Sequence, residues 1–377
     1  MSSVPSYFND FLRNIRLTAS QVDDCKKGHS TLRERLHNDE KLKDIIIDSF
    51  LQGSYRRATA VRPFENAKKS DVDVIVVTNL DHDKVKPREA LDLFKPFLEK
   101  HYKDKYKPQG RSWGIELSYV ELDLVPTSAP SETVAKLVKS ESVRTDQTLE
   151  DISDWRLSPS WRPGVKALAE KTEEEQWRRE PLLIPDRDVQ IWDKTHPLAQ
   201  MDATQTKNAN CNRHYVNIVK CLKWWRIIQK PDPKYPKSYP LEHLCWVNCT
   251  DGVDSVAAGV VSVLESIRDR YRTNAVLKRT PSVPDHGVPE HNVLKRVSGD
   301  DFAKFHKNII DAATLARQAH DETDVRESVV LWRKLFGNQF PEPPVKKSDS
   351  GGSDPDKSGS YTPRKDVSII GGGRFAL

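Results

Sequence analysis

The feature that most constrains this 377-residue chain is an apolar, β-branched segment over residues 71–78 that carries two carboxylates. Its composition predicts a buried strand. Residues two apart on a strand point to the same face, so Asp71 and Asp73 should lie side by side. Two like charges on an apolar strand are costly unless a cation lies between them. The expected ion is Mg²⁺, which prefers oxygen ligands and often binds carboxylates together with substrate phosphates.

A second apolar strand, predicted over residues 120–126, carries a third carboxylate. We expect it to run antiparallel beside the first strand, which would bring Asp123 to the face of Asp71 and Asp73. Glu121 has the same parity as Asp123 and is the candidate for a supporting role. Three carboxylates on neighbouring strands can hold two Mg²⁺ ions, with Mn²⁺ as the alternative. One ion would activate a ribose hydroxyl, and the other would neutralise a triphosphate and the departing pyrophosphate.

A Gly-Ser pair precedes the two acidic strands. Gly53 lets the backbone approach a phosphate closely, and a following helix N-terminus would supply free N–H groups. Ser54 adds a hydroxyl group. Each of these residues alone has an ordinary structural explanation, such as a capped strand end or an ion pair with a nearby lysine. Their combination with three carboxylates on apolar strands is far more specific, and it predicts metal-dependent nucleotide chemistry.

The apolar pattern elsewhere predicts strands among helices first and helices alone afterwards. The expected elements are two helices between residues 7 and 50, the second opening at Ser30, a helix over 89–102, paired strands over 113–119 and 120–126, an irregular connector over 130–200, and helices over 208–338. Pro126 should end its strand, because proline cannot donate to a central ladder.

Three parts of the chain are expected from this pattern. Residues 1–200 would form a core with its connector, residues 201–340 a helical lobe, and residues 341–377 a disordered tail. The tail is rich in Pro, Gly, Ser, Lys and Asp, so it cannot bury enough apolar surface to offset its chain entropy.

The overall composition fits a soluble globular protein rather than a membrane protein or a dedicated DNA-binding domain. A net charge of +5 with 31% charged residues makes the chain only mildly basic. No apolar run approaches the roughly 20 residues that span a bilayer. The first residues lack the basic and apolar regions of a signal peptide, and five scattered cysteines favour reduced thiols. A cytoplasmic location is therefore expected.

The acidic motifs resemble those of the polymerase-β-like nucleotidyltransferases. Within that superfamily they are similar to the branch of 2′-5′-oligoadenylate synthetase, cyclic GMP–AMP synthase and the bacterial CD-NTases of CBASS antiphage defence. The matching segments are Leu51-Gln52-Gly53-Ser54, Ser70-Asp71-Val72-Asp73-Val74 and Val120-Glu121-Leu122-Asp123-Leu124-Val125-Pro126. The resemblance implies an α+β fold: a nucleotidyltransferase palm, with a mixed sheet and flanking helices, and a C-terminal helical lobe across a substrate cleft. It also implies that Gln52, Gly53 and Ser54 contact the nucleotide.

Two segments of the helical region continue the resemblance. Leu222-Lys223-Trp224-Trp225 looks like the helix whose lysine contacts the donor triphosphate, and Lys237-Ser238-Tyr239-Pro240 is similar to the segment whose serine contacts phosphate and whose tyrosine stacks on a base. A lysine is a mobile point charge suited to phosphate, and a tyrosine ring offers a flat stacking face. Lys220 lies one helical turn before Lys223, so the choice between these two lysines stays open. Tyr239 can also be explained as a turn residue.

Further segments resemble clade D of the CD-NTases. They include Gln109-Gly110-Arg111-Ser112, His196-Pro197-Leu198-Ala199-Gln200, Asp285-His286-Gly287-Val288-Pro289 and Gly373-Arg374-Phe375-Ala376. This resemblance implies that ATP and GTP are joined into a cyclic trinucleotide such as cyclic AMP–AMP–GMP. A 3′-hydroxyl would attack the α-phosphorus, and pyrophosphate would leave. A cyclic dinucleotide synthase is the alternative.

The resemblance also implies partners. Relatives in operons with an E1/E2-like conjugating enzyme are modified through their C-terminus, and a downstream effector recognises the cyclic product. The tail here ends in Gly373-Arg374-Phe375-Ala376-Leu377, in which the final leucine departs from a small-residue ending. Long nucleic acid could act as an activator through the basic run Lys100 to Lys107, as in the animal relatives.

Two rival functions remain open at this point. A template-free nucleotidyltransferase acting on RNA or another acceptor would share the metal site. A catalytically silent nucleotide-binding or RNA-binding scaffold would be expected to lack part of the acidic triad, and here all three carboxylates are present.

Overall fold

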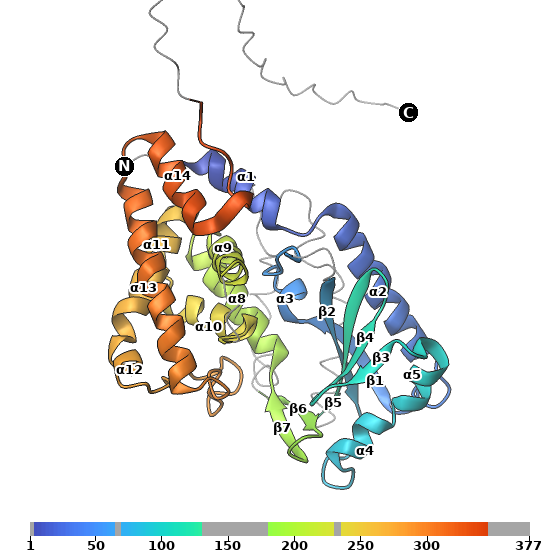
Figure 1. Cartoon of the computed structure of the whole chain (residues 1–377). Helices are drawn as coiled ribbons and strands as arrows, with labels where there is room; N and C mark the ends of the chain where they lie inside the picture. The colour runs from blue at the N-terminus through green and yellow to red at the C-terminus, as the bar shows by residue number, and fades with distance from the viewer. Residues whose placement is uncertain (1–3, 65–68, 130–179, 230–234, 346–377) are drawn as a thin grey trace, which may run out of the picture. The chain divides into compact units, whose positions relative to one another are not determined.

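The two acidic strands lie next to each other in a seven-stranded sheet of a computed structural model (Figure 1). The structure describes residues 4–64, 69–129, 180–229 and 235–345. The strand order is β1-β2-β5-β4-β3, with β6 paired to β5 and β7 paired to β6. The strands are β1 Ile46–Gln52, β2 Ser70–Thr78, β3 Tyr106–Pro108, β4 Trp113–Glu116, β5 Val120–Ser128, β6 Leu182–Asp186 and β7 Ile191–Thr195.

The pairing of β2 with β5 is parallel, so the expected antiparallel arrangement of these strands is wrong. The chain leaves β2 and returns through two helices and the β3–β4 pair, which is the kind of long crossover that parallel neighbours need. Asp73 lies directly opposite Asp123 in the register. Opposed residues of adjacent strands share a face in either arrangement, so the carboxylates still meet.

The alternation along β2 places carboxylates and core residues on defined faces. The even-numbered residues Val72, Val74 and Val76 are buried in one core under the helices. The odd-numbered face begins with Asp71 and Asp73 and becomes apolar only at Ile75 and Val77, which belong to a second, smaller cluster. The acidic end of this face therefore lies outside both apolar clusters.

Pro126 does not end β5, contrary to expectation, because the strand continues to Ser128. It lies in parallel register with Val76 on one side. On the other side, pairing with β4 stops at Leu124 and pairing with β6 involves only Ser128. Pro126 thus occupies a stretch where β5 has a strand partner on one side only, and a missing N–H is tolerated there.

Helices α2 (Ala19–His37), α4 (Pro87–Asp92) and α5 (Lys95–Tyr102) cover the even-numbered face of the sheet. The second helix begins after Thr18, not at Ser30, because Thr18 and Gln21 form a reciprocal capping box. Residues 46–52 form β1 instead of a helix end. The helix expected over 89–102 is divided in two, and the second part has a proline in its first turn, a favoured starting position.

The connector expected over residues 130–200 is partly regular. Its described end forms the β6–β7 hairpin and the start of α8 (Pro197–Asn210), so an irregular segment is the wrong description there. Residues 130–179 of this connector lie outside the described part of the chain.

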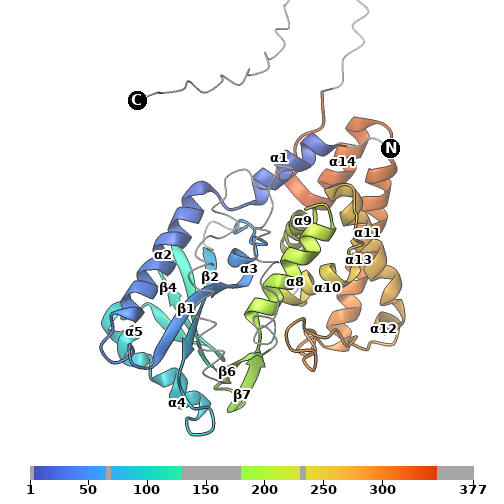
Figure 2. The ribbon, with the colours of Figure 1, turned by 180° about the vertical axis from the view of Figure 1, so that it is seen from behind.

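In the described residues from 197 onward the regular elements are helices, which confirms the helical region expected over 208–338. They are α8, α9 (Tyr215–Ile227), α10 (Ser238–Asn248), α11 (Val256–Arg270), the short α12 (Arg272–Val276), α13 (Gly299–Asp321) and α14 (Val325–Phe336), with a 3₁₀ turn at Gly337–Gln339. Figure 2 shows α8 and α9 between the sheet and α11–α13, as Figure 1 does from the opposite side.

The first helix, α1 (Pro5–Ile15), packs with the helical lobe instead of the sheet. The Phe8 ring lies 4.9 Å from that of Trp332, and the Phe11 ring lies 4.6 Å from that of Phe336. The chain therefore begins in one lobe and crosses to the other before α2. The domain boundaries at residues 200 and 340 stay a prediction, and residues 346–377 of the expected tail lie outside the described residues.

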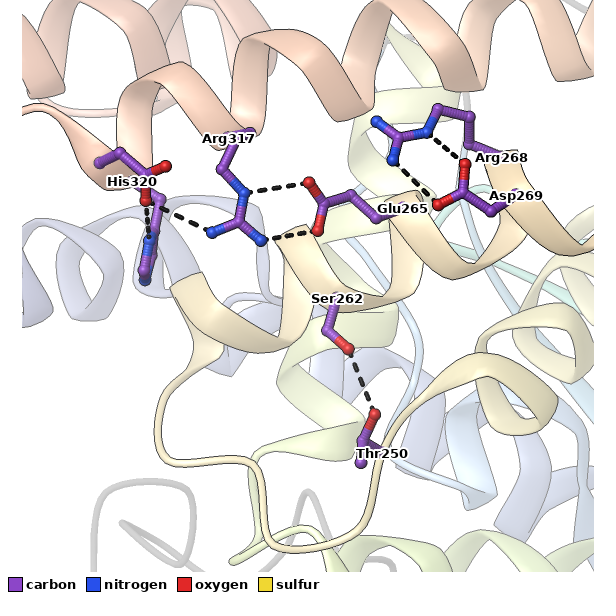
Figure 3. Close-up of polar contacts among 8 residues, drawn as sticks. Thr250, Ser262, Glu265, Arg268, Asp269, Arg317 and His320 are labelled. Atoms are coloured by element: carbon purple, nitrogen blue, oxygen red, sulfur yellow. Dashed lines mark hydrogen bonds and ion pairs between the residues drawn. The ribbon is translucent and has the colours of Figure 1, made fainter.

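Polar contacts on the outer side of the helical lobe join α11 to α13 (Figure 3). Arg317 of α13 donates to both carboxylate oxygens of Glu265 on α11, at 3.0 and 2.6 Å. Thr250 and Ser262 share a hydrogen bond near the start of α11. Among the described residues, no helix is long and apolar enough to cross a membrane.

Candidate active site

Three carboxylates converge at the acidic end of the β2–β5 pair. One ligand oxygen from each of Asp71, Asp73 and Asp123 lies within 4.8 Å of the other two. In the described part of the chain, no other group of three or more His, Cys, Asp or Glu side chains is close enough to share an ion. The parallel register produces this convergence, because it places Asp73 beside Asp123 and Asp71 one pleat away on the same face.

Mutual repulsion makes these carboxylates poor at holding negative charge without a cation. Enclosure by protein and the charges of Asp73 and Asp123 raise the pKa of Asp71 to about 8, although its side chain reaches the open cavity. Burial and the charge of Asp73 raise the pKa of Asp123 to about 6. Burial likewise raises the pKa of Asp73, against the opposing charge of Arg57. A set of oxygen ligands that lacks balancing positive charge fits a divalent cation.

Gly53 is required by the position of Asp73. The glycine has φ +74°, a left-handed conformation that other residues rarely adopt. A Cβ atom at this position would lie 1.8 Å from Oδ2 of Asp73. Gly53 also begins the short helix α3 (Gly53–Arg56) directly after β1. The absence of a side chain at Gly53 is expected to let the backbone approach a phosphate. In this structure it leaves space for the carboxylate of Asp73, a proposed metal ligand.

Gln109 contacts the third carboxylate, a role that the sequence did not predict. Its Nε2 donates to Oδ1 of Asp123 at 2.8 Å, and Ser112 Oγ donates to its Oε1 at 3.0 Å. A side chain at Gly114 would collide with this amide, because a Cβ there would lie 2.5 Å from Nε2. Gln109 lies in a turn before β4, and a turn residue gives no local sign of a contact with Asp123 on another strand.

A cavity of about 520 Å³ opens beside the carboxylates and lies between the sheet and the helical lobe. Its walls include all the predicted site residues except Asp123, namely Gln52, Gly53, Ser54, Asp71, Asp73, Lys223, Ser238 and Tyr239. This volume is within the range of about 300–1,000 Å³ that is usual for small-molecule sites.

Lys223, and not Lys220, is the lysine that reaches this cavity. Both lie on α9 and both are buried, but only Lys223 is among the wall residues. Ser238 is the first residue of α10, so its backbone N–H is one of those left free at a helix start. Tyr239 follows it, and its ring lies 5.3 Å from the Arg57 guanidinium.

A buried cluster of three charges lies in the same wall and joins the two lobes. Glu242 of α10 accepts from Lys223 Nζ at 2.9 Å and from Nε and Nη2 of Arg57, both at 3.2 Å. Burial opposes the charge of Glu242, but Lys223 and Arg57 hold its pKa below the usual value. Neither Arg57, which ends α3, nor Glu242 on the buried helix α10 is among the predicted site residues, because their contact depends on how α3 and α10 pack together.

The chain is similar to known proteins in both sequence and fold. The model of the Second Messenger Oligonucleotide or Dinucleotide Synthetase domain matches residues 1–141. The chain is 49% identical to a probable cyclic AMP-AMP-GMP nucleotide synthase of Salmonella paratyphi B, over 98% of this chain and 99% of that protein. It is 46% identical to the cyclic AMP-AMP-GMP synthase of Enterobacter hormaechei subsp. hoffmannii (strain UCI 50), over 98% of each.

Solved structures share the fold at low sequence identity. The complex of CdnC from E. coli MS115-1 with HORMA-deltaN aligns with a TM-score of 0.60 at 17% identity, over 89% of this chain and 98% of that chain. The CD-NTase CdnG of Bradyrhizobium diazoefficiens, in complex with GTP, aligns with a TM-score of 0.64 at 12% identity, over 89% and 95%. These likenesses agree with the expected α+β architecture of a palm and a helical lobe.

Proposed function

Because the chain belongs to the CD-NTase family of nucleotidyltransferases, which synthesise cyclic oligonucleotides for CBASS antiphage signalling, we propose that it condenses ATP and GTP into cyclic AMP–AMP–GMP. Two relatives that match almost its whole length bear that product in their names. The observation that carries the proposal is the convergence of Asp71, Asp73 and Asp123 beside a nucleotide-sized cavity. A cytoplasmic location belongs to the same proposal.

Asp71, Asp73 and Asp123 would hold two Mg²⁺ ions, or Mn²⁺ in their place. When bound, these ions would lower the pKa of the attacking hydroxyl and neutralise the triphosphate. The protein contributes the positions of the three carboxylates, which are set by the strand register, by Gly53 and by the amide of Gln109.

The remaining wall residues would bind and orient the nucleotides. Lys223 presents its ammonium group to the phosphates, and Gly53, Ser54 and Ser238 offer backbone N–H and hydroxyl donors at helix starts. Gln52 would line the nucleotide site beside them, and Tyr239 would stack on a base.

In each condensation the 3′-oxygen of one nucleotide forms a bond to the α-phosphorus of the next. The α–β anhydride bond breaks, pyrophosphate leaves, and the hydroxyl proton passes to solvent. Ring closure repeats this step within one molecule. Positioning and charge neutralisation supply most of the acceleration.

Product analysis tests the proposal directly. The wild-type protein should convert labelled ATP and GTP, with Mg²⁺, into a phosphatase-resistant product with the mass of a cyclic trinucleotide. Asp71→Ala combined with Asp73→Ala should reduce the rate by at least about a thousandfold while the protein stays folded by circular dichroism. Asp23→Ala with Asp311→Ala, which removes two exposed carboxylates, is the matched control. Product synthesis by the Asp71/Asp73 variant would refute the assignment.

The same experiment separates the rival activities. A template-free transferase acting on RNA or another acceptor would leave product with a phosphatase-sensitive end or attached to the acceptor. A cyclic dinucleotide synthase would give a smaller phosphatase-resistant product.

Interactions with other proteins and with nucleic acid are also part of the proposal. An E1/E2-like conjugating enzyme would act on the tail ending at Leu377, outside the described residues, and mass spectrometry after co-expression should find an adduct at that end. A downstream effector would recognise the product. Activation by long nucleic acid through Lys100 to Lys107 would appear as faster synthesis on addition of DNA or RNA.

A further inference from the structure

A second cavity, of about 340 Å³, lies next to the catalytic cavity. The two cavities share three wall residues, Thr195 at the end of β7, Gln200 on α8 and Tyr239 on α10. None of the three carboxylates of the proposed metal site lines the second cavity. It is therefore a neighbouring space and not a part of the metal centre.

Two of the three shared side chains, those of Tyr239 and Gln200, are held by one carboxylate. Asp285 Oδ2 accepts from the Tyr239 hydroxyl at 2.5 Å and from Gln200 Nε2 at 3.3 Å. Its other oxygen accepts from the backbone N–H of Gly287 at 2.9 Å. A wall of this kind fixes the orientation of Tyr239 and lets one ligand contact residues of both cavities.

Positively charged side chains from four separate segments line the second cavity. They are Arg111 in the β3–β4 turn, Lys194 on β7, Lys237 before α10, and Lys295 and Arg296 before α13. Apolar surface comes from valines of the segment before α13 and from the ring of Tyr235. Cationic groups beside apolar and aromatic surface are the combination that a nucleotide needs, because its phosphates are anionic and its base is flat.

Part of this positive charge is already balanced by carboxylates. Asp193 accepts from Arg111 at 2.7 Å, pairs with His291 at 2.9 Å and lies 3.6 Å from Lys295. Arg111 also contacts Asp186, and Lys194 pairs with Glu290 in a half-exposed position. Lys237 and Arg296 add positive charge beyond these pairs, and Asp285 in the wall adds one more carboxylate. The cavity therefore retains an excess of one, with five cationic side chains against four carboxylates in and around it.

We propose that this second cavity binds the 5′-triphosphate end of the linear intermediate while the 3′-hydroxyl of that intermediate lies at the metal site. This inference rests on the proposed function, because a trinucleotide requires an intermediate that is longer than one nucleotide. Retention keeps the intermediate at the site for the next condensation, a gain in effective concentration. For ring closure the same end leaves the second cavity and enters the catalytic cavity, where its α-phosphorus is attacked and pyrophosphate departs.

Lys295→Ala combined with Arg296→Ala tests the proposal, since neither residue lines the catalytic cavity. The ratio of released linear dinucleotide triphosphate to cyclic trinucleotide should rise about tenfold, from the loss of charge-assisted contacts. Lys295→Arg with Arg296→Lys, which keeps both charges, should restore most of the wild-type ratio. Lys41→Ala with Lys43→Ala, which removes two exposed lysines between α2 and β1, is the matched control and should leave the ratio unchanged. An unchanged ratio in the Lys295/Arg296 variant, or an equal fall in all products, would overturn the proposal.

A binding measurement keeps this inference separate from the proposed function. The Asp71→Ala, Asp73→Ala protein cannot turn over the ligand if the proposed function is right, and calorimetry can follow its binding of a synthetic linear dinucleotide with a 5′-triphosphate. Adding Lys295→Ala and Arg296→Ala should weaken that binding about tenfold, and should not weaken binding of the same dinucleotide without its 5′-triphosphate. Equal weakening of both ligands, or of neither, would overturn the second site. A wild-type protein that makes no cyclic trinucleotide would instead refute the proposed function.

Discussion

Two charge clusters border the same cavity, and they differ in whether the protein itself balances the charges of the cluster. The cluster of Asp71, Asp73 and Asp123 brings together three carboxylates, and their pKa values are raised by burial and mutual repulsion. The cluster around Glu242 surrounds one carboxylate with Lys223 and Arg57, which lower its pKa despite burial.

This difference separates a site that lacks a balancing cation from a cluster that already contains its own, even though one member of that second cluster, Lys223, is also proposed to contact phosphate. The carboxylate triad is incomplete without a cation from outside, which is the pattern expected of a functional site. The Glu242 cluster is complete within the protein, and it connects α3 of the sheet lobe with α9 and α10 of the helical lobe. The stability of the protein should therefore depend on metal and pH through the first cluster. The loss of one charged side chain should destabilise the protein more in the second cluster.

The largest expected effect comes from breaking the balanced cluster. Glu242→Ala would leave Arg57 and Lys223 buried without their partner, and it should lower the free energy of unfolding by about 3–5 kcal/mol. Urea denaturation of the metal-free protein measures this value. Asp71→Ala is the contrasting variant, and it should leave metal-free stability equal or higher because it removes repulsion. If Asp71→Ala destabilised the protein as much as Glu242→Ala, the distinction would be wrong.

The pH dependence of stability should identify the unbalanced cluster. Asp71 and Asp123 have folded pKa values of about 8 and about 6, above the ordinary carboxyl value of about 4. Between these values the folded state binds more protons than the unfolded state. The contribution of both groups to stability is thus fully present below pH ~4 and is lost as pH rises through 6 and 8.

Melting temperatures in EDTA and in Mg²⁺ across this range measure the effect. Because protons compete with the metal, the stabilisation by Mg²⁺ should grow from pH 6 to pH 8. The Asp71→Ala variant should show a flatter profile in both conditions. A metal shift that is the same at every pH would contradict the assignment of the triad as a metal site.

A smaller effect is expected at Gln109, which orients one carboxylate and carries no charge. Gln109→Ala removes a hydrogen bond to a carboxylate and should reduce kcat/KM about tenfold. It should also weaken Mn²⁺ binding, measured by electron paramagnetic resonance in the absence of nucleotide. Gln109→Glu places another negative charge beside Asp123, and at low metal concentration it should reduce kcat/KM more than Gln109→Ala does. Unaltered Mn²⁺ binding in Gln109→Ala would indicate that the amide does not position Asp123.

The smallest effect is expected from an ion pair on the surface. Arg317 and Glu265 have good bidentate geometry, but their side chains are 42% and 23% exposed. Arg317→Ala should therefore change the free energy of unfolding by less than about 1 kcal/mol. Urea denaturation of this variant and of Glu242→Ala compares the two effects directly. If both variants lost the same free energy of unfolding, burial would not explain why the Glu242 cluster matters more than the surface pair.

Several elements could be predicted because their signals are local. The β-branched alternation of residues 71–78 is visible within one segment, and so is the helical periodicity over residues 215–225, which form part of α9. The start of α2 also has a local signal, but two candidate caps compete for it, and Thr18 rather than the expected Ser30 caps the helix. The helical expectation up to residue 50 is wrong from residue 46, because β1 depends on pairing with β2.

The sequence by itself determined that Asp71 and Asp73 share a face and that apolar strands carry three carboxylates, because strand geometry fixes which neighbours along the chain point together. Only the tertiary structure decided that β2 and β5 run parallel, that Gln109 supports Asp123, and that Arg57 meets Glu242 185 positions later in the chain. Contacts of that kind depend on how separate elements pack to bury their apolar faces, and no short stretch of sequence records the result.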